Sequence, residues 1–355
     1  MVAMLKVKTP DIMEKNKDLK PLIGMTVEQL REVAAECGLP SFAAKQMARW
    51  LYVRRVTDID AMTDLSLRGR DALKQHYTVG RVAPKAEAAS ADGTVKFLFE
   101  GMGGRDIEAV YIPDRDRATL CVSSQAGCRM GCTFCMTGRQ GFHGNLPASA
   151  IINQILSIPQ SEQLTNIVFM GMGEPLDNME SLLPAIEVLT APWGLAWSPK
   201  RITVSSIGHL KNLRRLLDET KVHVAISLHS PFPSEREGLM PVERAFPMRD
   251  VIGLLREYDF AHQRRLSFEY IIWRGVNDDL RHADALARQL RGLDCRVNLI
   301  RFHAIPDSPL RPAPEQVMTA FRDRLNEAGI TATIRASRGE DIQAACGMLA
   351  GKARQ

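Results

Sequence analysis

The sequence predicts an α/β fold, in which a partial barrel of six βα units follows an N-terminal helical domain and a β-hairpin. Two observations predict it. From residue 118 onward, strand-like and helix-like segments alternate, whereas residues 21–78 repeat apolar residues every three or four positions. A length of 355 residues suits one large domain with a smaller appendage. We therefore divide the chain into residues 1–84, 85–116 and 117–355.

The first of these regions predicts a small bundle of three helices. Thr26 precedes an amphipathic run that extends to Cys37, and a Gly-Leu-Pro sequence follows it as a stop signal. Ser41 is expected to cap a second helix that continues to Arg54, and a third helix is expected at about 66–76.

The positive charge of the chain is concentrated near its N-terminus. Residues 1–85 contain fifteen Lys and Arg against ten Asp and Glu, whereas the remaining residues contain thirty-one of each. A basic helical region on a neutral body favours a phosphate-rich partner such as RNA. A solvated helix face would give the same count, so the charge alone does not establish this partner.

The second region predicts a β-hairpin. Val95–Phe99 and Ile107–Ile112 are rich in β-branched and aromatic residues, and three glycines lie in the intervening segment 101–104.

The third region predicts a parallel sheet. The expected strands are Thr119–Ser123, Asn166–Met170, Arg201–Ser205, His223–Leu228, Leu266–Ile272 and Arg296–Phe302, and the expected helices lie near 147–158, 178–190, 209–218, 247–258, 280–291 and 314–328. Six strands need not close a barrel, so a partial barrel is expected. Chemistry in βα barrels collects at the C-terminal ends of the strands.

The composition argues against several classes of protein. Apolar content of 45% and charged content of 25% are ordinary for a globular protein, and no apolar stretch is long enough to cross a bilayer. The first twenty residues have no signal-peptide core. Seven unevenly spaced cysteines do not suggest a disulfide framework. We expect a cytoplasmic monomer that does not bind membranes.

Three cysteines follow the first predicted strand of the barrel and form the most informative motif. Cys128, Cys132 and Cys135 supply three thiolates, whereas a [4Fe–4S] cluster that only carries electrons usually has four cysteine ligands. One iron would therefore stay open for a small molecule. A zinc knuckle is the alternative. Zinc sites, however, usually combine two CxxC-type pairs or add histidines at set spacing, and no second pair is visible in this sequence.

Further candidate ligands follow the other predicted strands. They are Gly173, Glu174, Ser205, Ser227, Leu228, His229 and Asn298. Each residue alone could be a structural group at a strand end. Their common position at one rim of the barrel favours a single pocket.

The cysteine spacing, with Phe134 before the last cysteine, resembles the signature of radical S-adenosylmethionine (SAM) enzymes. Further segments are similar to the RlmN/Cfr family of RNA methyltransferases, and the resemblance covers roughly residues 20–350. These segments are Cys121–Cys128, Gln140–Phe142, Asn145–Leu146, Met170–Pro175, Ile226–His229, Val297–Ile300 and Asp341–Gly347.

The resemblance implies a mechanism with two SAM molecules. One methylates the Cys346 thiolate, and the second binds the open iron and yields a radical that takes hydrogen from that methyl group. The methyl carbon then adds to adenine, Glu108 is the implied proton acceptor, and Cys121 breaks the thioether by forming a disulfide with Cys346. Glu108 could instead be a surface charge on the hairpin.

The resemblance also assigns cofactor contacts. Gly173 and Glu174 would bind the amino group of SAM, and Phe134 would pack on its adenine. Ser205, the Ser227–His229 segment and Asn298 would complete the SAM site.

The resemblance implies methylation at C2 of adenosine 2503 in 23S rRNA and adenosine 37 in tRNA, with an electron donor such as flavodoxin or ferredoxin. Pro175 is typical of the RlmN type, whereas Cfr-like C8 methylation is the nearest alternative. Loop 301–312 departs from the family pattern. Another radical SAM class and a non-catalytic zinc-binding RNA-binding protein remain as rival interpretations.

Overall fold

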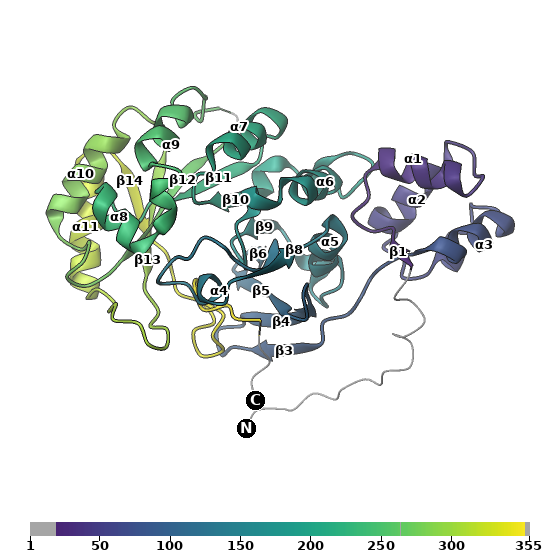
Figure 1. Cartoon of the computed structure of the whole chain (residues 1–355), viewed down its shortest axis with the longest axis horizontal. Helices are drawn as coiled ribbons and strands as arrows, with labels where there is room; N and C mark the ends of the chain where they lie inside the picture. Colours follow the sequence, from purple (N-terminus) through teal and green to yellow (C-terminus); the bar gives the residue numbers. More distant parts are fainter. Residues whose placement is uncertain (1–18, 263, 352–355) are drawn as a thin grey trace.

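The computed structural model describes residues 19–262 and 264–351. An N-terminal helical bundle lies beside a larger α/β body, and the hairpin region lies along one side of that body (Figure 1). Within the described ranges, no helix combines the length and the apolar character that crossing a membrane would require.

The α/β body is built on one sheet of ten strands, seven of which are parallel. The parallel strands, in spatial order, are β6 (Arg117–Cys121), β9 (Asn166–Phe169), β10 (Ile202–Ser206), β11 (His223–Ser227), β12 (Leu266–Ile272), β13 (Arg296–Arg301) and β14 (Thr331–Ile334). The six predicted strands are confirmed. Strand β14 was not predicted, because it has four residues and only one of them, Ala332, is buried.

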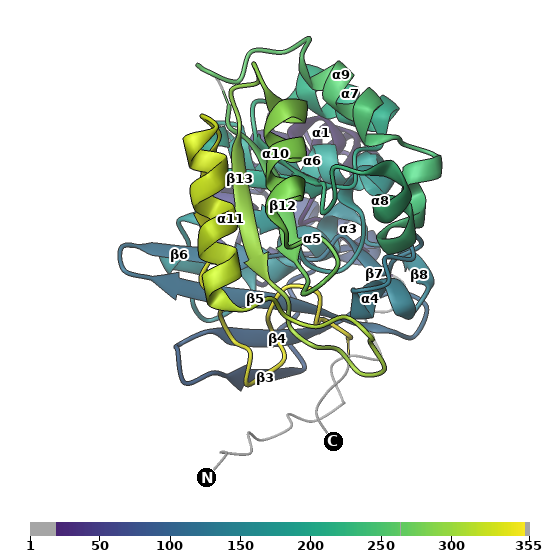
Figure 2. The same ribbon diagram turned by 90° about the vertical axis from the view of Figure 1, so that its left-hand side faces the viewer.

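Helices connect successive parallel strands and pack on the outside of the curved sheet (Figures 1 and 2). The six predicted helices are present as α5 (Ala148–Leu156), α6 (Met179–Thr190), α7 (Leu210–Glu219), α9 (Met248–Leu255), α10 (Leu280–Leu290) and α11 (Glu315–Glu327). Their apolar faces form the core with the strands; in α7, for example, Leu213, Leu216 and Leu217 are buried. Two short helices, α4 (Met136–Arg139) and α8 (Pro233–Leu239), were not predicted from the sequence.

The predicted hairpin is present and continues the barrel sheet. Strands β3 (Ala86–Ala89), β4 (Val95–Glu100) and β5 (Asp106–Asp114) are antiparallel, and β5 pairs with β6 so that Val110 lies opposite Cys121. The hairpin therefore brings its side chains beside the first barrel strand.

The N-terminal bundle contains α1 (Val27–Glu36), α2 (Ala43–Ala48) and α3 (Leu67–His76), together with the two-residue strands β1 (Lys20–Pro21) and β2 (Tyr77–Thr78). Thr26 caps α1 as predicted: its Oγ1 accepts the Gln29 N–H at 3.3 Å, and its own N–H donates to Gln29 Oε1 at 2.9 Å.

The start of the second helix differs from the prediction. Ser41 does not cap α2; Phe42 takes the cap position, is itself in a helical conformation and makes no side-chain cap bond. The helix continues as a π-helical turn over Arg49–Val53. The cap was mispredicted because a serine before an apolar run is only a local signal.

Candidate active site

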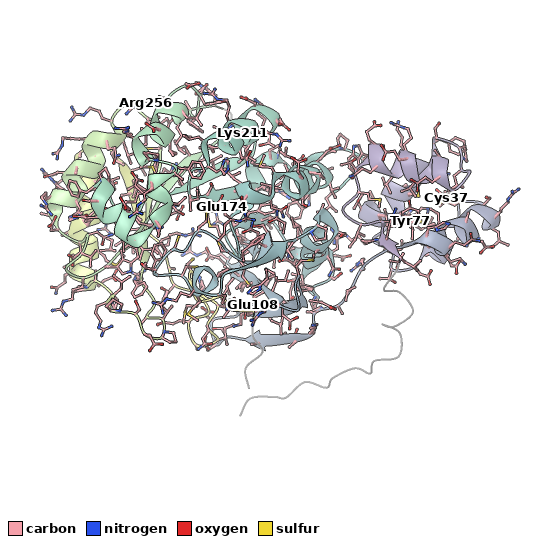
Figure 3. All side chains as sticks on the ribbon, in the orientation of Figure 1. Cys37, Tyr77, Glu108, Glu174, Lys211 and Arg256 are labelled. Atoms are coloured by element: carbon pink, nitrogen blue, oxygen red, sulfur yellow. The ribbon has the colours of Figure 1, made fainter. Side chains whose placement is uncertain are left out.

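A cavity of about 930 Å³, including its open mouth, lies at the C-terminal ends of the parallel strands. Ten of the residues singled out in the sequence line it: Cys128, Cys132, Phe134, Cys135, Gly173, Glu174, Ser205, Ser227, His229 and Cys346. Glu108, Cys121, Leu228 and Asn298 do not line it. In Figure 3, Glu174 lies at the centre of the barrel and Glu108 below it on the hairpin.

The cysteine loop is closed by a two-stranded ribbon, β7 (Gln125–Gly127) and β8 (Phe142–Asn145). Gly127 has a φ of 72°, and a Cβ there would lie 1.9 Å from the Gly141 carbonyl oxygen, so only glycine fits. The Cys128 N–H donates to that carbonyl at 2.9 Å. The ribbon therefore fixes where the loop leaves the sheet.

The three loop thiols lie in an environment that disfavours uncompensated thiolates. Burial raises the pKa of Cys128 to about 12 and raises that of Cys132 well above its ordinary value. The charges of Cys135 and Glu174 contribute to both increases in the same direction as burial. A cationic metal centre would offset this repulsion, so the thiol set fits an iron–sulfur cluster.

In the described part of the chain, no group of three or more His, Cys, Asp or Glu surrounds one point in the way that a single metal ion requires. A [4Fe–4S] cluster makes a different demand, because each thiolate binds its own iron. Cys346 is a fourth cysteine on the same cavity wall.

Glu174 is a buried carboxyl at the end of β9. Its Oε1 accepts the Leu176 N–H at 3.1 Å and its Oε2 accepts the Ile207 N–H at 3.0 Å. Burial raises its pKa to about 7, although these hydrogen bonds and one from Ser206 act in the opposite direction. A ligand ammonium group beside this carboxyl would compensate the cost of burying its charge.

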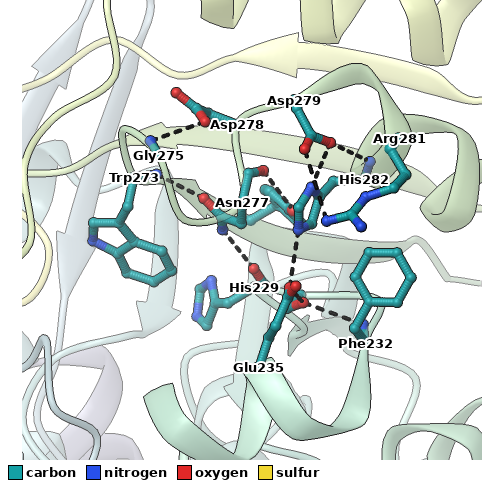
Figure 4. Close-up of polar contacts among 12 residues, drawn as sticks. His229, Phe232, Glu235, Trp273, Gly275, Asn277, Asp278, Asp279, Arg281 and His282 are labelled. Carbon is teal, nitrogen blue, oxygen red and sulfur yellow. Dashed lines mark hydrogen bonds and ion pairs between the residues drawn. The ribbon is translucent and has the colours of Figure 1, made fainter.

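His229 is held in a single orientation in the cavity wall (Figure 4). Its φ of 61° is unusual for a residue with a side chain. The Ile271 N–H donates to its Nδ1 at 3.0 Å, so the proton of the neutral ring is on Nε2. Burial, and then Arg236, lowers its pKa to about 3. The ring packs edge-on against the Phe134 ring, with the two ring centroids 5.0 Å apart. The two rings together form an aromatic wall of the cavity.

Asn277 supports this wall from behind, as Figure 4 shows. Its Nδ2 donates to the His229 carbonyl at 2.7 Å, and its Oδ1 accepts the Trp273 N–H at 2.7 Å. Nothing in the sequence identified Asn277, because its role depends on two strand ends meeting in space.

Arg236 is a second buried support that the sequence did not reveal. Its guanidinium donates to the carbonyls of Ser227 and Leu228, each at 3.1 Å, and of Ile207 at 3.2 Å. It also forms an ion pair with Glu243. One planar group thereby ties the end of β11 to the residue after β10.

Cys346 is exposed on the cavity wall and shares its surroundings with Cys121 and Arg335. Burial, followed by Cys346, raises the pKa of Cys121 to about 12, while the Arg335 guanidinium acts in the opposite direction. Arg335 Nη1 also lies 3.6 Å from Glu269 Oε2. Arg335 was not predicted as a site residue, because the short strand that precedes it was not predicted.

The segment 336–351, which carries Cys346, contains no helix or strand and is tied down on two sides. The Gly339 N–H donates to Asp92 in the hairpin at 3.0 Å. On the other side, Thr137 next to the cysteine loop donates to the Leu349 carbonyl at 2.8 Å. Polar contacts therefore hold the cysteine between the hairpin and the cysteine loop.

Glu108 is not a surface charge, since only 1% of it is exposed. Its Oε1 pairs with Lys96 Nζ at 2.9 Å, and its Oε2 accepts the N–H groups of Ala350 and Gly351 at 2.7 and 3.1 Å. The expectation of a surface charge was wrong. The alternation of side chains along a hairpin strand shows which residues share a face, but it does not show that the C-terminal segment covers that face.

Two predicted cofactor contacts lie behind the cavity wall. Asn298 Nδ2 donates to Glu269 Oε1 at 2.7 Å, so its side chain reaches the cavity only through Glu269. Leu228 is fully buried. Of the two cysteines without a predicted role, Cys295 is buried away from the cavity and Cys37 lies in the N-terminal bundle (Figure 3).

Two family models match the chain. Residues 20–79 match the ribosomal RNA large subunit methyltransferase N-terminal domain, and residues 122–286 match the radical SAM superfamily.

Similar proteins cover almost the whole chain. A probable dual-specificity RNA methyltransferase RlmN of Parabacteroides distasonis is 58% identical over 94% of this chain and 97% of its own length. The dual-specificity RNA methyltransferase RlmN of Syntrophotalea carbinolica is 41% identical over 94% of this chain and 90% of its own. The crystal structure of a radical SAM methyltransferase from Sphaerobacter thermophilus is 38% identical, with a TM-score of 0.88 over 94% of this chain and all of that one.

Replacing Arg236 should destabilise the protein. Arg236→Met leaves the Glu243 carboxylate buried without its partner, so we expect the free energy of unfolding to fall by about 3–5 kcal/mol in chemical denaturation. Adding Glu243→Leu should restore part of the loss, because the unpaired charge is then removed. A loss below about 1 kcal/mol for Arg236→Met would contradict the assigned role.

His229 should stay neutral at pH values where an ordinary histidine is protonated. Because its folded pKa of about 3 lies below the unfolded value of about 6.5, the unfolded chain takes up a proton first as the pH falls. Stability should therefore decrease below pH 6.5, by up to roughly 1.4 kcal/mol per pH unit.

Nitrogen-detected NMR of the folded protein should show the Nε2–H form of His229 from pH 8 to pH 5. The denatured chain is the control and should titrate near 6.5. Titration of folded His229 near pH 6 would overturn the assignment, and His229→Gln should reduce the pH dependence of stability.

Proposed function

The chain belongs to the RlmN family of radical SAM RNA methyltransferases, and from this we propose that it methylates C2 of adenine in RNA. The proposed targets are adenosine 2503 of 23S rRNA and adenosine 37 of tRNA, and Cys346 is the proposed carrier of the methyl group. The names of the relatives, which describe dual-specificity RNA methyltransferases, support two classes of RNA substrate.

One observation carries the proposal: Cys346 lies on the wall of the cavity that the three loop cysteines and Glu174 also line. A sulfur in this position can meet both a cluster-bound cofactor and a base that enters the cavity. A zinc-binding RNA-binding protein would not require a cysteine there.

The residues of the cavity suit the cofactors that the family uses. Cys128, Cys132 and Cys135 would each bind one iron of a [4Fe–4S] cluster, and Glu174 would receive the amino group of SAM. His229 and Phe134 offer an aromatic wall for the adenine of SAM. When bound, the cluster and SAM supply one-electron chemistry that removes hydrogen from an unactivated methyl group.

The cysteines would perform the transfer itself. C2 of adenine is an electron-poor carbon and is not a nucleophile. It therefore cannot take the methyl group of SAM by direct displacement. Cys346 would first lose its proton and take a methyl group from SAM by displacement. After losing one hydrogen atom, the methyl carbon would bond to C2 of adenine, and the adduct would give up the C2 proton and one electron, which the oxidised cluster could accept. The Cys121 thiolate would then attack the Cys346 sulfur and form a disulfide, while the carbon leaves with the electron pair of the C–S bond and takes a proton to complete the new methyl group. A reductant must return both thiols before the next turnover.

Glu108 is proposed to accept the proton that the adenine carbon loses. Its hydrogen bonds to Ala350 and Gly351 put it at the end of the segment that carries Cys346. Lys96 pairs with Oε1, and the Ala350 and Gly351 N–H groups both donate to Oε2. The segment would therefore have to shift before Oε2 could accept a proton from the base. An electron carrier such as flavodoxin or ferredoxin would supply the electron.

Mass spectrometry of the freshly isolated protein tests the carrier. We expect a methyl group on Cys346 and none on Cys295, which lies outside the cavity. An unmodified Cys346 whose replacement also removes iron would instead assign it as the fourth cluster ligand.

Cys121→Ala should trap the intermediate. Without the second thiol, the bond between protein and RNA cannot be broken, so a covalent adduct should accumulate on denaturing gels, whereas Cys295→Ala should release product normally. Product without any adduct in Cys121→Ala would show that another group resolves the thioether.

The site of methylation separates the two branches of the family. Digestion of the RNA product should give 2-methyladenosine, whereas 8-methyladenosine would support Cfr-like chemistry. Anaerobically prepared protein should contain about four irons per chain. A protein that binds RNA but contains only zinc would overturn the proposal.

A further inference from the structure

A second hollow lies at the opposite end of the barrel, where the parallel strands begin. It measures about 1240 Å³, including its open mouth. Its wall contains Arg117, Thr119, Asn166, Lys200, Thr203, His223, Arg265, Ser267, Arg296 and Thr333. Each of these residues lies within two positions of the first residue of one of the seven parallel strands. The parallel pairing that builds the cofactor cavity at one end of the barrel therefore builds this hollow at the other.

The charges around this hollow are not balanced. Four exposed cations, Arg117, Lys200, Arg265 and Arg296, surround its mouth, and none of them forms an ion pair with any described residue. The carboxylate in the wall is Glu269, which already contacts Arg335 and Asn298. Arginines on the outer helices behave differently; Arg215 and Arg324, for example, each contact two carboxylates.

His223 reports the resulting positive field. It begins strand β11, and its Nδ1 accepts the Arg265 N–H at 2.7 Å. Burial and then the charges of Arg265, Lys200 and Arg264, in that order, lower its pKa to about 4. An anion in the hollow would reverse the electrostatic part of this effect.

We propose that this hollow is a binding site for an oligophosphate, either the backbone of an RNA strand or a nucleoside polyphosphate. The four cations come from segments at four different places along the curved sheet, whose neighbouring strands are roughly 4.8 Å apart. A single phosphate is too small to contact cations on strands as far apart as β6 and β13, whereas linked phosphates present several charges along the rim. The hydroxyl and amide groups of Thr119, Asn166 and Thr203 add hydrogen-bond partners within the hollow.

The site is separate from the proposed methylation chemistry. The hollow and the cofactor cavity share Met170, Glu269 and Arg335, and none of the four mouth cations lines the cofactor cavity. Binding at the mouth can therefore be measured in protein that performs no methyl transfer.

The test follows the imidazole resonances of His223 by NMR in the full chain at low ionic strength, with His223→Gln to assign them. Two probes are titrated separately: sodium tripolyphosphate and a single-stranded oligouridylate. We expect a saturable shift and a higher pKa of His223. Sodium chloride at matched ionic strength should not produce this response, because screening alone does not saturate at a site.

Replacing two of the mouth cations provides the mutational test. Lys200→Ala with Arg296→Ala should weaken binding by about tenfold or more, since each cation makes charge-assisted contacts with phosphate. Arg244→Ala with Arg249→Ala is the matched control: it removes the same charge from exposed positions outside the hollow and should leave affinity within about twofold. Thermal unfolding of both double variants verifies that they fold.

The two probes also identify the source of the phosphates. Saturation by tripolyphosphate alone would identify a small oligophosphate, and saturation by the oligouridylate would identify an RNA backbone. If neither probe gives a saturable shift at His223, or if the Lys200 and Arg296 variant binds as tightly as the control, the hollow is not an oligophosphate site.

Discussion

The parallel pairing of strands β6 and β9–β14 is the constraint on which the rest of the structure depends. Since these strands all run in one direction, their C-terminal ends meet at one rim, and residues far apart in the sequence line one cavity. The backbone hydrogen bonds of the sheet fix the spacing of these ends. The same constraint brings the N-terminal ends together at the opposite mouth, where cations gather.

Buried polar groups convert this approximate arrangement into a defined one. Strand ends leave carbonyl and N–H groups unpaired, and burying them without partners would be costly. Arg236 satisfies three such carbonyls, and Asn277 links the His229 carbonyl to the Trp273 N–H just after the end of β12. Neither side chain is proposed to touch a reacting atom. Each holds backbone that carries cavity residues, which explains why large polar residues occur inside the core.

The segment that carries Cys346 follows a different physical rule. It has no regular secondary structure and is held by contacts with the hairpin and the cysteine loop, including those made by Asp92, Thr137 and Glu108. Individual polar contacts of this kind can break without unfolding the sheet. The barrel thus carries the proposed cofactor ligands, while a separately held segment carries Cys346, whose proposed role requires it to meet different partners in turn.

The sequence by itself determined the features that depend on local pattern. Alternating periodicity located six parallel strands and their helices, and the spacing of Cys128, Cys132 and Cys135 indicated the cluster loop. The features that depend on distant residues meeting were decided only by the tertiary structure. Strand β14 is too short to show a pattern, so Arg335 beside Cys121 and Cys346 was missed. The burial of Glu108 depends on a segment more than two hundred residues away, and the cations at the barrel base, which have no ion-pair partner within residues 19–262 and 264–351, come from separate strands. Periodicity reports which face of an element is buried, but it does not report which other element covers that face.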